Sequence, residues 1–183
     1  MIKEIQQEIK TNRTFLKGIG ILEIVGGITG IGLIIWLMLQ ESETNTLVLL
    51  ILLIAVGFYF YSIYAGIILF KKLENGVLHS LVLQYLQIPA FSIGGFTYIM
   101  TSGGYFLLGF NFATSSINFS FALIASKFQI DILTNSDSAF IKLNLLAILV
   151  LALIENSLKK IMKYSKLKAN YDRNMNEWLN PKN

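Results

Sequence analysis

One carboxylate in this sequence lies inside a hydrophobic stretch. Residues 18–39 are apolar except for Glu23 and one threonine, and Glu23 follows Lys17 by about 9 Å of helix. A carboxylate at that depth is costly in lipid, and intramembrane acids usually face a partner group or a water-filled cavity. Glu23 is therefore a candidate for binding a proton or cation. The alternative is a structural glutamate that reaches a lysine near the membrane surface, such as Lys159 or Lys160.

A second group of polar side chains has helical spacing. Ser80, Gln84 and Gln87 recur at i, i+4 and i+7, which places them on one face of a helix. Such a stripe favours contact with protein over contact with lipid, either along a narrow aqueous path or headgroup pocket, or as hydrogen bonds that hold helices together. His79, the single histidine, is either a pH sensor or a hydrogen-bonded polar cap near the membrane surface.

Other kinds of chemistry are poorly represented. The chain has no cysteine, which excludes disulfides and thiolate metal sites, and we find no nucleophile elbow, zinc-binding HExxH or phosphate-binding P-loop pattern. We therefore expect no catalytic residue, no metal site, no cofactor and no enzymatic activity. The net charge of +4 is too modest to indicate a nucleic-acid partner.

Two glycines in the first hydrophobic stretch have the spacing of a helix-packing motif. Gly26 and Gly30 form a G-x-x-x-G pair, which allows two backbones to approach closely in a membrane. We expect this face to pack within the chain; self-association of two copies is the alternative.

The composition indicates a membrane protein. The chain is 54% hydrophobic and only 14% charged, against about 25% charged residues in average soluble domains, and its mean hydropathy is +0.60. A helix crosses a hydrocarbon layer of about 30 Å with about 20 apolar residues. Four segments meet this length, although Pro89 and the pair Gly94–Gly95 are expected to bend the third. The predicted spans are 18–39, 47–70, 77–100 and 139–158.

The positions of the basic residues predict the orientation. Of the 15 lysines and arginines, only Lys127 and Lys142 fall on the outer side of the predicted spans, and the loop 41–46 carries two acids and no base. The positive-inside rule then places both termini on the cytoplasmic side of the membrane. We expect this membrane to be a bacterial inner membrane. The basic tail 159–183 would lie where it can contact anionic lipids.

The segment between the third and fourth spans has strand character. Its apolar residues alternate with small or polar ones, a period of two that indicates a half-buried strand, and a turn is expected at 114–116. We predict an outer β-hairpin over 105–132; the alternative is a re-entrant or spanning helix over 105–123. The alternating apolar residues are Ile117, Phe119, Phe121 and Leu123, with Asn118, Ser120 and Ala122 between them.

These features predict an all-α membrane protein, with four transmembrane helices in a bundle and a small extracytoplasmic β-hairpin between the third and fourth helices, in a single domain over 1–183. The expected function is that of an accessory or scaffold component that binds a partner protein or lipid, or associates with itself. The alternative is an oligomeric pore or small carrier subunit with a polar path along the third helix.

Overall fold

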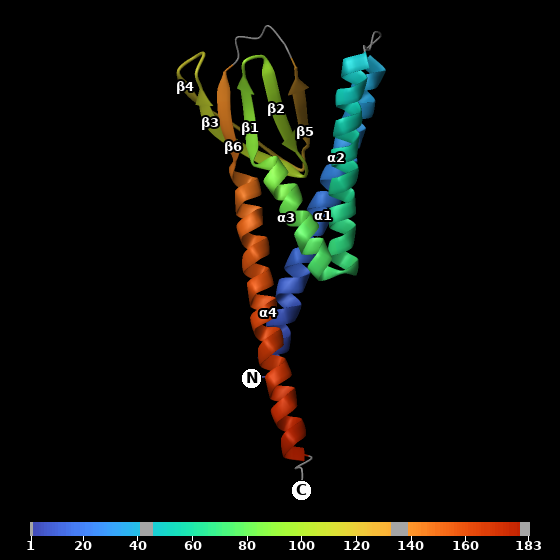
Figure 1. The fold of residues 1–183 in the computed structure, drawn as a ribbon, viewed down its shortest axis with the longest axis vertical. Helices are drawn as coiled ribbons and strands as arrows, with labels where there is room; N and C mark the ends of the chain where they lie inside the picture. The colour runs from blue at the N-terminus through green and yellow to red at the C-terminus, as the bar shows by residue number, and fades with distance from the viewer. Residues whose placement is uncertain (1, 41–45, 133–138, 180–183) are drawn as a thin grey trace.

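The computed structural model describes residues 2–40, 46–132 and 139–179, in which four helices combine with one antiparallel sheet. The first two helices form a long hairpin, the third leads up into the sheet, and the fourth leaves it (Figure 1). Both ends of the chain lie at the lower end of the molecule, opposite the sheet. The helices are α1 (Ile2–Gln40), α2 (Thr46–Lys71), α3 (Leu73–Gln87) and α4 (Leu145–Leu179).

The sheet has six strands, and each neighbouring pair is antiparallel. Its order is β4-β3-β6-β1-β2-β5, so the two edges are β4 and β5. The strands are β1 (Pro89–Ile93), β2 (Phe96–Thr101), β3 (Gly104–Asn111), β4 (Ser116–Leu123), β5 (Lys127–Asp131) and β6 (Phe140–Asn144).

The predicted all-α bundle of four transmembrane helices is wrong. Within the described residues only α1 and α2 are long and apolar enough to cross a membrane. The predicted span 77–100 is divided, because Pro89 supplies no backbone N–H to continue α3 and instead opens β1. The predicted span 139–158 begins as strand β6 and becomes helical only at Leu145.

A glycine pair explains why the third segment returns as a hairpin. Gly94 and Gly95 connect β1 to β2, with φ values of +60° and +79°. Two consecutive left-handed residues form the tight turn that matches the twist of paired strands, and glycine adopts this conformation without steric penalty. The bend that the sequence suggested is therefore a strand reversal.

The sheet is strongly curled. Its two edges, β4 and β5, would lie about 24 Å apart in a flat sheet, yet only residues 124–126 connect them. Four Cα steps span at most about 14 Å, so the edges must approach each other at this end. On the inner face, Ala90 and its ladder partner Ile99 form one hydrophobic cluster with Leu107.

The two faces of the sheet differ in polarity. Ladder partners share a face, so the registers give one face of apolar residues and one that is largely polar. The apolar face is the outer one, and on β3, β4 and β6 it carries many exposed side chains. These are Leu108, Phe110, Ile117, Phe119, Phe121, Leu123, Ile141 and Leu143. The inner, concave face carries Ser92, Thr97, Thr101, Asn118, Ser120, Lys127, Gln129, Lys142 and Asn144.

The predicted outer hairpin over 105–132 is therefore also corrected. The alternating residues do form a strand, β4, and it pairs with β3, but the pair belongs to the larger sheet. The polar side of β4 belongs to the inner, concave face of the sheet. Its apolar side therefore faces outward. On β2 and β5, the outer face packs against the helices through Met100 and Phe128, which join a cluster with Ile34 and Tyr59. Most of the predicted loop 41–46, and residues 180–183 of the tail, lie outside the described residues.

Candidate functional site

Glu23 lies in a buried hydrogen-bonded cluster. Its side chain is 2% exposed, and its two carboxylate oxygens accept hydrogen bonds from α3. Ser80 Oγ donates to Oε2 at 2.8 Å, and Gln84 Nε2 donates to Oε1 at 3.3 Å. The two donors are one helical turn apart, so the face that they share is turned toward α1. Three of the five predicted polar candidates thus lie together.

The cluster continues to the base of the sheet. Ser62 of α2 donates to the backbone oxygen of Glu23 at 2.8 Å and contacts Ser102 Oγ at 2.8 Å. The backbone N–H of Ser102 donates to Gln87 Oε1 at 2.6 Å. Gln87 therefore joins the same polar track through Ser102 rather than by bonding to Glu23. Ser62 and Ser102 were missed by the sequence reasoning, although Ser62 is the one hydroxyl other than tyrosine inside the span 47–70.

Glu23 has no basic partner among the residues that the structure describes. Lys159, a suggested partner, instead contacts Glu155 at 3.7 Å, and both side chains are exposed. Both of its carboxylate oxygens accept hydrogen bonds, and Gln84 turns its amide nitrogen rather than its oxygen toward them. Chemically, this arrangement can hold Glu23 as a carboxylate or can bind a proton on it.

His79 is separate from this cluster. Its Nδ1 lies 3.1 Å from the hydroxyl of Tyr61, and its ring packs edge-on against Tyr64 with 5.0 Å between centroids. The histidine therefore contacts α2 through two aromatic side chains. A hydrogen-bonded cap requires such a contact, and the choice between the two roles expected for His79 stays a prediction.

Gly26 and Gly30 each lie against another part of the same chain. A Cβ at Gly26 would overlap the backbone of Gly103 in the link between β2 and β3, and a Cβ at Gly30 would overlap the ring of Tyr59 in α2. Ser126 also donates to the backbone oxygen of Gly26 at 2.7 Å. The two glycines thus allow α1 to approach two different elements, and these contacts need no second copy.

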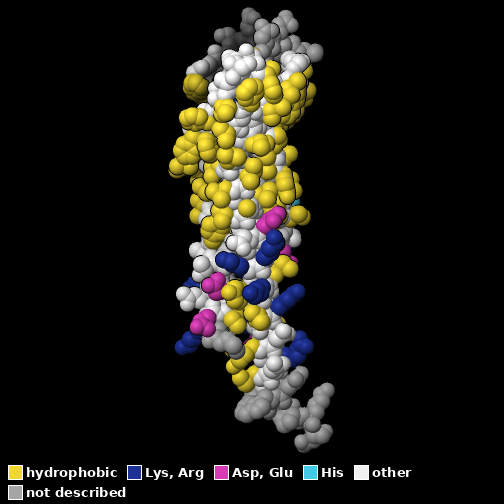
Figure 2. All heavy atoms as spheres, turned by 90° about the vertical axis from the view of Figure 1, so that its left-hand side faces the viewer, with side chains coloured by type: hydrophobic (Ala, Val, Ile, Leu, Met, Phe, Trp, Pro, Cys, Tyr) yellow, Lys and Arg dark blue, Asp and Glu magenta, His cyan; other side chains and the backbone are white. Residues whose placement is uncertain are grey.

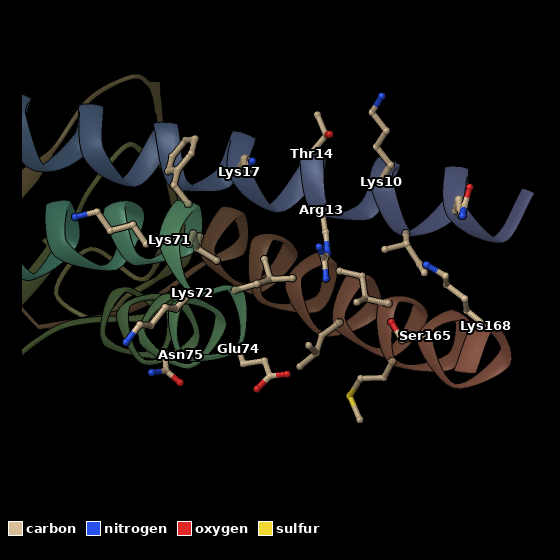
Figure 3. Close-up of a pocket in the computed structure, with 18 residues that line it drawn as sticks. Lys10, Arg13, Thr14, Lys17, Lys71, Lys72, Glu74, Asn75, Ser165 and Lys168 are labelled. Carbon is tan, nitrogen blue, oxygen red and sulfur yellow. The ribbon is translucent and has the colours of Figure 1, made fainter. Parts of the chain in front are cut away.

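A basic groove, which the sequence reasoning missed, lies at the lower end of the molecule. It has a volume of about 1130 Å³ and lies between the first half of α1, the connection from α2 to α3, and α4. Figure 3 shows Arg13 pointing from α1 toward α4 and Lys168 reaching back toward α1, whereas Lys10 points away. Its basic lining residues are Lys10, Arg13, Lys17, Lys71, Lys72 and Lys168, and Glu74 is the acidic one.

The groove also has an apolar floor. Leu69, Leu73, Leu158 and Ile161 line it, and the same residues belong to the hydrophobic cluster that joins α1, α2, α3 and α4. A cavity with an apolar floor and a basic rim matches an amphiphile with an anionic head. The sequence shows these basic residues only as separate flanks of different segments, so their convergence depends on the tertiary packing.

The structure thus brings Glu23, Ser80 and Gln84 into direct contact, connects Gln87 through a backbone group, and leaves His79 apart. In the described residues, no group of three or more His, Cys, Asp or Glu is arranged to hold a metal ion. Comparisons with protein-family models, with curated proteins and with solved structures find no match to this chain.

Proposed function

We propose that this chain is a multi-pass membrane protein that acts as an accessory component by binding lipid. The observation that carries the proposal is the continuity of its apolar surface. Exposed hydrophobic residues cover the α1–α2 hairpin and continue over the outer face of the sheet. On the side seen in Figure 2, hydrophobic side chains cover the upper region, and the charged side chains lie below it.

The burial of the two long helices supports a lipid environment. In the most hydrophobic window of α1, and likewise of α2, only 28% of the residues are buried inside the molecule. A core helix of a soluble protein is apolar because it is mostly buried, whereas these helices expose their apolar side chains. Exposed apolar patches of this extent mark contacts with membranes or partners.

The depth of the sheet agrees with this environment. The apolar segment 18–39 of α1 is about 33 Å long, and its lower boundary is marked by Lys17, with Lys71 and Lys72 at the end of α2. The base of the sheet contacts α1 at Gly26, about 12 Å above that boundary, and a five-residue strand adds about 17 Å. The sheet therefore stands beside the upper half of the hairpin (Figure 1), within the depth that we assign to hydrocarbon.

The curl of the sheet makes this placement physically reasonable. Hydrocarbon tolerates strands only where their backbone groups are paired and their edges are closed. The short link 124–126 holds edge strands β4 and β5 close together at one end, and the polar side chains point inward. We expect the seam between these two strands to close in a bilayer.

The basic residues support one orientation. The lysine-rich end, with both termini, would lie in the cytoplasm, and the turns at the opposite end of the sheet would lie outside. The bacterial plasma membrane is the membrane to which we assign the protein. Lys127 and Lys142, the exceptions to the charge distribution, lie on the inner face of the sheet rather than on its lipid-facing side.

Single-cysteine variants test the proposed membrane placement, because the chain has no native cysteine. A nitroxide attached to Phe119→Cys on the outer face of β4, in liposomes, is expected to collide with oxygen and to be shielded from a water-soluble nickel chelate. The same label on Lys163→Cys, an exposed position of α4, should show the opposite preference. Equal exposure of both labels to nickel would place the sheet in water and contradict the proposal.

A pore or small carrier is the second candidate function, and the track from Glu23 through Ser62 to Ser102 favours it. We expect liposomes containing the protein to dissipate a proton or sodium gradient faster than empty liposomes, and Glu23→Gln or Gln84→Leu to abolish the difference. Ser165→Ala, in the distant groove, is the control. Wild-type liposomes that are as tight as empty ones to protons and sodium would exclude this role.

A further inference from the structure

The basic groove carries positive charge that no ion pair among the described residues neutralises. Six basic side chains line it, against Glu74 as the acidic one. Within the described residues, none of the six forms an ion pair, and Lys17 instead lies 6.0 Å from the centre of the Phe70 ring. Like charges gathered in one cavity repel each other, and an anion bound among them relieves that repulsion.

The height of the groove matches the headgroup layer of the proposed membrane. Lys17 immediately precedes the apolar segment of α1, and Lys71 and Lys72 immediately follow that of α2. Arg13 lies about 6 Å below Lys17 along the helix. The groove therefore opens where lipid phosphates lie if the α1–α2 hairpin crosses the bilayer.

The lining distinguishes an amphiphile from a small ion. The basic side chains form the rim, whereas Leu69, Leu158 and Ile161 form part of an apolar floor. Inorganic phosphate would use only the rim. A phospholipid would place its phosphate on the rim and its glycerol and first methylene groups on the floor, while its acyl chains run upward beside the helices.

We infer that this groove is a binding site for the headgroup of an anionic phospholipid, held by Arg13 of α1 and Lys168 of α4, with Lys72 of the link between α2 and α3 as a third cation in the lining. The inference rests on the proposed membrane function and names the lipid class that would be bound. It differs from general attraction of the basic tail to the membrane, because only Lys168 of the site comes from that tail. Basic pockets between helices at the cytoplasmic surface are a recognised mode of lipid recognition.

Native mass spectrometry of the full chain in detergent tests the site. The probes are phosphatidylglycerol and phosphatidylcholine with identical acyl chains, and the wild type is expected to retain the anionic lipid preferentially. Each basic residue near an anionic group contributes on the order of a few-fold to tenfold in affinity, so Arg13→Gln combined with Lys72→Gln should weaken retention by about 30-fold. The matched control is Lys163→Gln with Lys166→Gln, which removes the same charge from exposed positions of α4 outside the groove.

Three results would overturn the inference. Equal retention of the two lipids would show that the headgroup charge is not recognised. An equal loss in the control pair would show that the effect is diffuse attraction rather than binding in the groove. Displacement by inorganic phosphate or glycerol phosphate as readily as by added lipid would show a site for a free anion. Circular dichroism of each variant checks that the fold is retained.

The lipid-binding experiment and the test of the membrane placement can fail independently of each other. The label at Phe119→Cys reports where the sheet lies, whereas lipid retention in detergent reports the groove. A shielded label with no lipid preference contradicts the groove inference alone. A label exposed to nickel in a protein that still retains anionic lipid contradicts the proposed immersion of the sheet.

Discussion

Gly26→Val is expected to destabilise the protein by about 3 kcal/mol or more, as overpacking against rigid neighbours does. A Cβ at this position would overlap the backbone nitrogen and Cα of Gly103, and backbone atoms cannot rotate away as the end of a side chain can. The added atoms would separate α1 from the link between β2 and β3 and would also disturb the hydrogen bond from Ser126 to the Gly26 oxygen. Thermal unfolding in detergent, followed by circular dichroism, measures the effect.

The same helix supplies matched controls. Gly18→Val and Gly32→Val make the same substitution where nothing lies within 4 Å of the new Cβ, so both variants should unfold close to the wild type. If Gly26→Val were as stable as these controls and only changed the oligomeric state, the glycine face would mediate self-association. That result would contradict the close approach of α1 to the sheet.

The second large effect is expected for Glu23→Ala, which should lower the free energy of unfolding by about 3 kcal/mol. Without the carboxylate, Ser80 Oγ and Gln84 Nε2 lose their acceptor in a buried environment. A buried donor left without a partner costs about 1–3 kcal/mol. Glu23→Gln keeps the length of the side chain and an acceptor oxygen, so it should recover a large part of the loss in the same thermal unfolding measurement.

Glu155 provides the comparison for this carboxylate. It contacts Lys159 at 3.7 Å, but both side chains are largely exposed. Exposed pairs of this kind contribute at most about 1 kcal/mol, so Glu155→Ala should leave stability nearly unchanged. Equal losses for Glu23→Ala and Glu155→Ala would show that the buried cluster does not stabilise the fold.

The sequence was informative about the parts of the fold that depend on local composition. Residues 18–39 and 47–70 lie in α1 and α2, because long uninterrupted apolar runs have few alternatives to a helix of that length. The stripe of Ser80 and Gln84 was expected to face protein, and in the structure it contacts Glu23. Helical spacing and the penalty for polar groups in lipid were sufficient for that expectation.

The sheet could not be obtained in the same way. Mean hydropathy does not distinguish a helix from a strand, so the segments 77–100 and 139–158 passed the length test for a spanning helix although each contains a strand. Strand β6 pairs with β1 and β3, which are distant in sequence, and no local pattern gives that pairing. Pro89 and the pair Gly94–Gly95 were the available signals, and they were interpreted as a kink.

The candidate sites also differ in how far the local sequence could predict them. The contacts of Glu23 follow from which faces of two helices are polar, whereas Ser102 lies in a link between strands that the prediction did not contain. The basic groove needs α4 to lie beside the start of α1, and this arrangement is a property of the tertiary structure. From the sequence, the basic residues of the groove were used only to predict the orientation of the chain in the membrane.

In the proposed membrane placement, the curled sheet also constrains the order in which the parts of the protein can insert. Strands of five to eight residues are too short to partition into a bilayer one at a time, whereas α1 and α2 are long enough to leave the translocon as a pair. The α1–α2 hairpin would therefore enter the bilayer first. Its residues Ile34 and Tyr59 would then form the surface against which the sheet packs. Until the sheet closes, edge strand β4, which carries no charged side chain, would be free to pair with strands of other chains.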